Sequence, residues 1–141
     1  MALFLVLFSA VSNYDLVFNQ YQRSYELSAW NTSEMGKVIH DFGDLFGSTD
    51  TAYVVAYPYW VDTRLVGINA GDPTRDYAIW PDQFASTLSD PRPKMFLVNP
   101  EDQADLDLLR QLFPQGNVFT AISHVDKNFY VYMVPPASVT P

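Results

Sequence analysis

The sequence of 141 residues contains no cysteine, and this absence removes several classes of site. Such a chain forms no disulfide framework, binds no metal through thiolates and has no cysteine nucleophile. Basic residues are also scarce: 8 Lys and Arg stand against 16 Asp and Glu, which gives a net charge of −8 and a pI near 4.4. Because so acidic a chain repels phosphate backbones, we expect no nucleic acid partner.

Motifs for metals, phosphates and covalent catalysis are missing as well. The two histidines, His40 and His124, have no further ligand at metal-site spacing, so we predict no metal site. No glycine-rich turn follows the first expected strand, where a nucleotide cradle needs one. The G-x-S-x-G nucleophile elbow is also missing. The sequence therefore predicts no cofactor and identifies no catalytic residue, and it leaves open whether the chain is an enzyme.

The chain lacks an apolar run of the roughly 20 residues that a membrane-spanning helix requires. Residues 1–13 nevertheless form an apolar lead segment, in which Met1 to Val11 contains only one polar residue, Ser9. This segment is either a buried helix or strand of the domain, or the end of a longer membrane helix. We favour the second interpretation, because so apolar a start is unusual at a free N-terminus.

Between the lead segment and a proline-rich loose tail at 135–141, residues 14–134 read as a single α/β domain. Apolar residues at helical spacing and short β-branched, aromatic runs alternate along it. Helices are expected over 15–25, 31–47, 60–71 and 99–113, and strands over 51–57, 77–80, 94–98, 118–122 and 129–134. This alternation predicts a three-layer, Rossmann-like fold with a mostly parallel sheet of about five strands and a C-terminal antiparallel hairpin.

One group of residues is a candidate ligand site because of its position. Ligands of open α/β sheets bind outside the carboxyl ends of the strands. The candidates after the first strand are Tyr57, Tyr59, Trp60, Asp62 and Arg64, and those after the third strand are Asn99 and Glu101. Aromatic faces beside charged groups can bind a sugar ring by stacking and by paired hydrogen bonds. The alternative interpretation, an aromatic cap over the core with surface charges, is the commoner arrangement.

Taken in order, the segments also resemble a known family. An apolar exit leads to the connector YDLVFNQYQRSYELSAW, then to SEMGKVIHDFGDLF, TAYVVAYPYW, KMFLVNPEDQADLDLLRQLFPQG and the closing strands NVFTAI and FYVYMVPP. This layout resembles the C-terminal soluble region of bacterial multispanning glycosyltransferases, the protein mannosyltransferase-like and lipid A aminoarabinose transferase-like enzymes. The resemblance implies a parent enzyme that uses polyprenyl-phosphate-linked sugars.

In that family the catalytic acid lies far upstream of this region, so the resemblance transfers no catalytic residue. It implies a non-catalytic accessory domain on the extracytoplasmic side of the bacterial cell membrane, which helps to bind a glycan or a polyprenyl-linked sugar. Two alternatives stay open: a free-standing α/β domain that binds or senses a small molecule, and a small Asp-dependent hydrolase or transferase.

Overall fold

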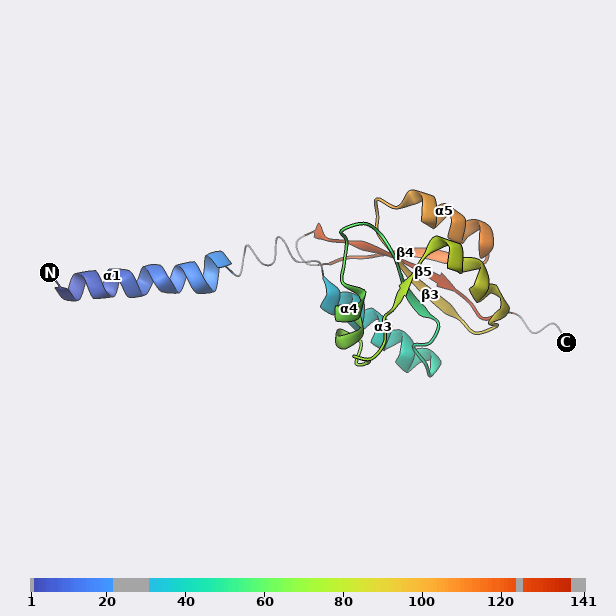
Figure 1. Ribbon diagram of the computed structural model, residues 1–141, viewed down its shortest axis with the longest axis horizontal. Helices are drawn as coiled ribbons and strands as arrows, with labels where there is room; N and C mark the ends of the chain where they lie inside the picture. Colours follow the sequence, from blue (N-terminus) through green and yellow to red (C-terminus); the bar gives the residue numbers. More distant parts are fainter. Residues whose placement is uncertain (1, 22–30, 124–125, 138–141) are drawn as a thin grey trace. The chain divides into compact units, whose positions relative to one another are not determined.

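The computed structural model describes residues 2–21, 31–123 and 126–137 (Figure 1). The chain divides into two compact units, Met1–Trp30 and Asn31–Pro141. The apolar lead segment falls within the first unit. His124 and the end of the loose tail lie outside the described residues.

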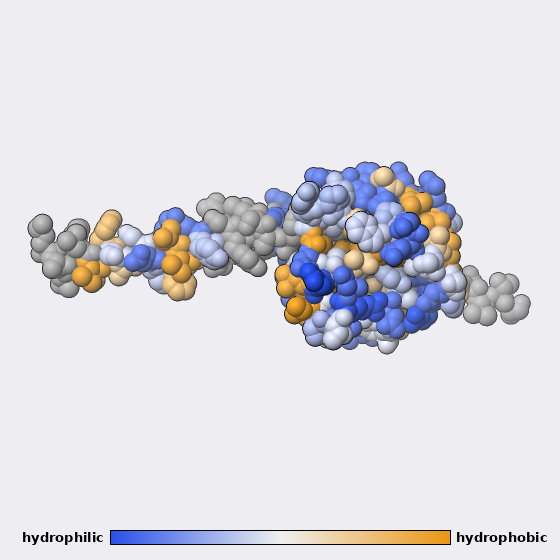
Figure 2. Space-filling view, in the orientation of Figure 1, coloured by the Kyte–Doolittle hydropathy of each residue, from blue (hydrophilic) through white to orange (hydrophobic). Residues whose placement is uncertain are grey.

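The first unit contains helix α1 (Ala2–Tyr14), which continues into the π-helical turn η1 (Asp15–Gln20). The helix expected over 15–25 is confirmed for residues 15–21, where the Tyr14 and Phe18 rings lie 4.7 Å apart, whereas residues 22–25 lie outside the described residues. Apolar side chains are exposed along the helix (Figure 2), and they are Val6, Leu7, Phe8, Val11, Tyr14, Leu16, Val17, Phe18 and Tyr21. None of the helices within the described ranges has both the length and the apolar content required to cross a bilayer.

The second unit is an α/β fold built on one five-stranded sheet, with strand order β2-β1-β3-β5-β4. Its elements are α3 (Thr32–Phe46), β1 (Ala52–Val55), α4 (Thr63–Asn69), β2 (Ala78–Ile79), the 3-10 helix η2 (Pro81–Ser89), β3 (Lys94–Val98), α5 (Gln103–Leu112), β4 (Asn117–Ala121) and β5 (Phe129–Val134). All five expected strands form.

The sheet is mixed rather than mostly parallel. Strand β1 pairs in parallel with β2 and β3, whereas β5 is antiparallel to both β3 and β4. The expected C-terminal hairpin is therefore confirmed, but its second strand docks beside β3. The sequence did not predict this docking, because the pattern of a hairpin does not specify which of its strands pairs with the rest of a sheet.

Helices cover both faces of the sheet, with α3 and α4 on one face and α5 and η2 on the other (Figure 1). Strand β3 is buried along its whole length, as a central strand between two helical layers should be. Its residues alternate: Phe96 and Val98 enter a core with Leu106 and Leu109 of α5, while Met95 faces Phe42 of α3. This alternation follows from the two-residue period of a strand.

The helix ends correct one prediction. Gly47 ends α3 in the left-handed conformation with φ of 81°, as expected. The helix expected over 99–113 begins later than predicted, because α5 starts at Gln103 and Asp102 is its cap. Asn99 instead accepts a hydrogen bond from the Glu101 N–H at 2.8 Å, which builds a tight turn before the helix.

Candidate functional site

The carboxyl ends of β1 and β3 lie side by side, and the chain leaves them in different directions. The loop after β1 leads to α4 on one face of the sheet, and the loop after β3 leads to α5 on the other. Such a divergence is where open α/β sheets place their ligand crevices. The Tyr57 hydroxyl donates across it to Glu101 Oε2 at 3.5 Å. Desolvation, followed by the Glu101 carboxylate, raises the pKa of Tyr57.

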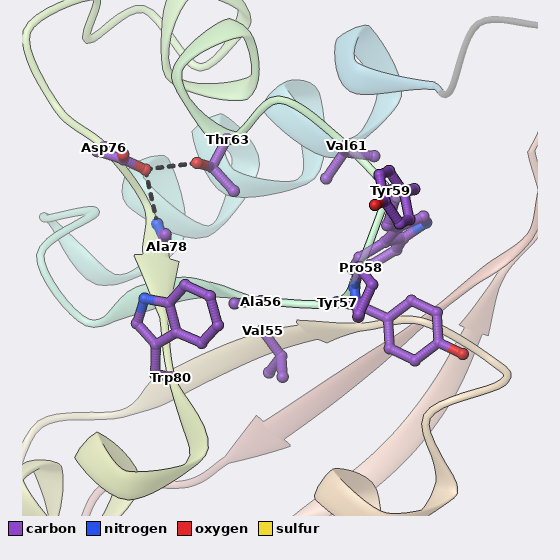
Figure 3. A pocket seen from close by; sticks show the side chains of 11 residues that line it. Val55, Ala56, Tyr57, Pro58, Tyr59, Val61, Thr63, Asp76, Ala78 and Trp80 are labelled. Atoms are coloured by element: carbon purple, nitrogen blue, oxygen red, sulfur yellow. Dashed lines mark hydrogen bonds between the residues drawn. The ribbon is translucent and has the colours of Figure 1, made fainter.

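A hollow of about 610 Å³ adjoins this edge, between the loop after β1 and strand β2. We call it the Trp80 hollow, and its lining residues are Val55, Ala56, Tyr57, Pro58, Tyr59, Trp60, Val61, Thr63, Asp76, Ala78 and Trp80. In Figure 3 the Trp80 ring lies beside Ala56, Asp76 and Thr63 point toward each other beyond Ala78, and the Tyr57 ring extends away from all of these.

The aromatic residues of the Trp80 hollow differ in what they can offer to a ligand. Trp80 is 59% exposed and Tyr59 is fully exposed, so both can stack on a ring. Trp60 is only 4% exposed and packs in the core. It lines the hollow but offers little ring surface to a ligand. The hollow therefore has two available aromatic faces, of which the sequence predicted one.

A polar pair completes the lining. Thr63 Oγ1 donates to Asp76 Oδ1 at 2.5 Å, and the Ala78 N–H donates to the same oxygen at 3.0 Å. The Thr63 hydrogen bond, followed by that from Ala78, lowers the pKa of Asp76, so its carboxylate is ionised at neutral pH. An ionised carboxylate in the same hollow as an exposed indole is well suited to bind sugar hydroxyls, which donate strong hydrogen bonds to carboxylate oxygens.

Three of the residues predicted from the sequence have local structural roles. The Asp62 carboxylate caps α4 by accepting from the N–H groups of Arg64 and Leu65. The Arg64 side chain lies 3.7 Å from that carboxylate, in an exposed pair outside the lining of the Trp80 hollow. Asn99 is buried in its turn. Of the seven predicted residues, Tyr57, Tyr59 and Trp60 line the hollow, and Glu101 meets Tyr57 across the strand edge.

Sequence reasoning missed Trp80 and Asp76, which lie on either side of β2. That strand has only two residues, and Asp76 and Trp80 are four residues apart, a separation of about 13 Å along an extended chain. Both side chains nevertheless line the same hollow, at different ends of it. Trp80 could have been found by applying the carboxyl-end rule to the second strand, whereas the sequence carries no signal for Asp76.

A carboxylate pair at the start of α5 was also missed. Asp102 is buried, and its carboxylate accepts from the Asp105 N–H at 3.2 Å. Burial, reinforced by the neighbouring Asp102 carboxylate, raises the pKa of Asp105 to about 6. One member of the pair thus holds a proton under conditions in which ordinary aspartates are ionised.

We expect Asp105→Asn to stabilise the protein at about pH 7.5 but not at about pH 4. The folded state keeps a proton that the unfolded state releases near pH 3.8, so the stability contributed by Asp105 is present below that pH and is lost as the pH rises to about 6. The asparagine amide can donate to Asp102 without this loss. Urea unfolding should show a gain of about 1 kcal/mol at the higher pH, after allowance for solvent screening.

The control is Asp107→Asn on the same helix, where the carboxylate pairs with Arg110 at 2.8 Å on the surface. This control should show no comparable gain. Equal effects of Asp105→Asn at the two pH values would contradict the assignment.

Tyr59 has an unusual backbone, with φ of 56°. This left-handed conformation costs a non-glycine residue about 1–2 kcal/mol, and asparagine tolerates it better. We expect Tyr59→Asn to raise the free energy of unfolding by about 0.5 kcal/mol, which chemical denaturation can measure. The same substitution at Tyr14, where φ is −60°, should give no stabilisation. A lower free energy of unfolding for Tyr59→Asn would show that contacts of the Tyr59 ring stabilise the fold by more than its left-handed backbone destabilises it.

The described residues include no group of three or more His, Asp or Glu side chains placed to hold a metal ion. His40 is exposed on α3, with Nε2 lying 3.6 Å from Asp44 Oδ2. Comparisons with protein-family models, curated proteins and solved structures found no match to this chain.

Proposed function

We propose that this chain is a Rossmann-like, non-catalytic accessory domain that binds sugar at the Trp80 hollow and is held at a membrane by its N-terminal segment. Its parent would be a bacterial membrane-bound glycosyltransferase that uses polyprenyl-phosphate-linked sugars, with this domain on the extracytoplasmic side.

The observation that carries the proposal is the pairing of aromatic faces with an ionised carboxylate in one hollow. Trp80 and Tyr59 are exposed to solvent there, although burial of their rings would favour folding. Asp76 Oδ1 is occupied by Thr63 and Ala78, and Oδ2 is the oxygen left to accept hydroxyl groups of a ligand. A sugar ring presents an apolar C–H face and a hydroxyl rim, and this lining matches both.

The membrane part of the proposal relies on the first unit. Exposed apolar side chains run from Val6 to Tyr21, and the stretch contains a single charged side chain, Asp15. Its carboxylate accepts hydrogen bonds from Asn19 at 2.9 Å and Gln20 at 2.6 Å on the same helix. Internal pairing of this kind reduces the cost of bringing a charge close to lipid. Residues 6–21 contain no Lys or Arg that could attract anionic lipids, so this stretch favours a neutral bilayer over an anionic one.

Calorimetric titration of the full chain with methyl glycosides of glucose, mannose and galactose tests the sugar part. We expect saturable binding of at least one glycoside with a Kd of about 1 mM, as suits a shallow open site. Absence of binding heat and of any stabilisation by the whole panel, at concentrations tenfold above that value, would refute the proposed function.

Flotation with phosphatidylcholine vesicles tests the membrane part. We expect the full chain to float with the vesicles and Val11→Asp to reduce the bound fraction at least tenfold, since a charge within an inserted helix costs about 2.5 kcal/mol or more. Gln111→Asp adds the same charge on the exposed side of α5 and should float normally. Equal flotation of the two variants would contradict insertion of this helix.

The Asp102–Asp105 pair favours a second candidate function, an Asp-dependent hydrolase. A carboxyl whose pKa is raised to about 6, as that of Asp105 is, beside a second carboxyl is an arrangement used in acid–base catalysis. Turnover of nitrophenyl glycosides by the chain, lost in Asp105→Asn, would favour this second candidate over the binding function.

A further inference from the structure

Strand β4 is a free edge of the sheet within the described residues. It pairs with β5 on one side, and four of its five residues are exposed to solvent, including Val118 and Phe119. Phe119 is 58% exposed, and Ile122, which follows the strand, is exposed as well. The opposite edge, β2, has only two residues and offers little backbone for pairing.

The β4 edge lacks the features that keep edge strands from pairing with other chains. Natural edges are usually protected by charged side chains, by proline or by shortness. Residues 116–123 (GNVFTAIS) contain no charge and no proline. The chain carries a net charge of −8, so two copies repel each other over much of their surface. At residues 116–123 they can approach without repulsion between charged side chains of the pairing strands.

An apolar surface continues from this edge onto the sheet. Phe119 is in register with Val131, and Asn117 with Met133. Val131 and Met133 line a groove of about 210 Å³, whose other apolar residues are Val38, Phe42, Leu45, Phe46 and Met95. Since cross-strand neighbours lie within contact distance, the Phe119 ring extends the groove to the edge.

We propose that β4 pairs antiparallel with β4 of a second copy of this chain, which joins two sheets into one of ten strands. Antiparallel pairing of identical strands about a twofold axis closes the assembly at a dimer. Centred on Phe119, it places this residue opposite its counterpart, Val118 opposite Thr120, and Asn117 opposite Ala121.

The position of Phe119 favours a second copy over an unrelated strand. It is the central residue of the five in β4, so twofold pairing brings the two largest apolar side chains of the edge together. Aromatic cross-strand pairs stabilise antiparallel sheets. The pairing also supplies partners for the backbone N–H and C=O groups that alternate residues of an edge strand direct outward.

Sedimentation velocity of the full chain in nonionic detergent tests this dimer. We expect a reversible dimer of two 16.0 kDa chains. Phe119→Lys should weaken association at least tenfold, because two ammonium groups would then face each other. Ile68→Lys is the matched control, since Ile68 is 57% exposed on α4, and it should leave the dimer unchanged.

A mixing experiment separates pairing at β4 from general effects of charge. Phe119→Lys and Phe119→Glu should each be monomeric alone and should form a dimer when combined, because only facing side chains complement one another. A chain that stays monomeric up to about 100 μM, a dimer that survives Phe119→Lys, or mixed variants that fail to associate would each overturn the proposal. The sugar titration tests the Trp80 hollow and sedimentation tests the β4 edge, so the proposed sugar binding and the proposed dimer can each fail without the other.

Discussion

Trp80→Ala is expected to weaken sugar binding at least tenfold while leaving the fold intact. The indole is 59% exposed, so its removal takes little from the core. The backbone of Trp80 anchors η2, since its N–H donates to Gln83 Oε1 at 3.0 Å and its carbonyl accepts from the Gln83 N–H at 2.9 Å. Alanine retains both hydrogen bonds. The tenfold loss corresponds to about 1.4 kcal/mol of lost stacking.

Two further variants make this result specific to the aromatic face. Trp80→Phe keeps a ring and should lose threefold or less in affinity. Leu88→Ala truncates an exposed apolar side chain of η2, the helix that follows Trp80, and should bind as the unmodified chain does. Calorimetric titration measures affinity and thermal unfolding measures stability in all three. Undiminished binding by Trp80→Ala would exclude the Trp80 hollow as the sugar site.

Phe96→Ala is expected to cost about 3–5 kcal/mol in the free energy of unfolding. Phe96 is fully buried on the central strand β3, with ring centroids 5.2 Å from Tyr53, 5.6 Å from Phe84 and 5.7 Å from Phe113. Truncation would leave a cavity bordered by β1, η2 and α5 together. Since close-packed interiors relax only partially, most of the lost contact energy would not be recovered.

The same truncation at Phe18 is the control, because that ring is exposed in the first unit. Phe18→Ala should leave the unfolding midpoint of the second unit within experimental error. Urea denaturation monitored by circular dichroism compares the two variants. A loss below about 1 kcal/mol for Phe96→Ala would show that this aromatic cluster is not the centre of the core.

The elements of the fold were predictable because the signals for them are local. The β-branched run after Gly47 and the run KMFLV specify buried strands, and the left-handed Gly47 ends α3 where expected. The docking of β5 beside β3 was not predictable. It depends on side chains distant in sequence, such as Tyr132, whose hydroxyl donates to the Phe113 carbonyl at 2.7 Å.

The candidate site was predictable in position and only partly in composition. The carboxyl-end rule located Tyr57 and Tyr59 correctly at the strand edge. The rule could not tell that Asp62 would serve as a helix cap, since a capping aspartate and a ligand-binding aspartate look alike in sequence. Asp76 is held at the hollow by hydrogen bonds from the Ala78 N–H and from Thr63, thirteen residues away, and a pairing so distant in sequence leaves no local pattern.

Nuclear magnetic resonance of the ¹⁵N-labelled full chain, titrated with the methyl hexosides, tests sugar binding most directly. Binding at the Trp80 hollow predicts a saturable shift of the Trp80 indole N–H, accompanied by shifts of the Thr63, Asp76 and Ala78 amides, with a Kd of about 1 mM. Amides of β4, on the far edge of the sheet, should not move. An unshifted Trp80 indole across the whole panel, or shifts centred on another surface, would contradict sugar binding at the Trp80 hollow.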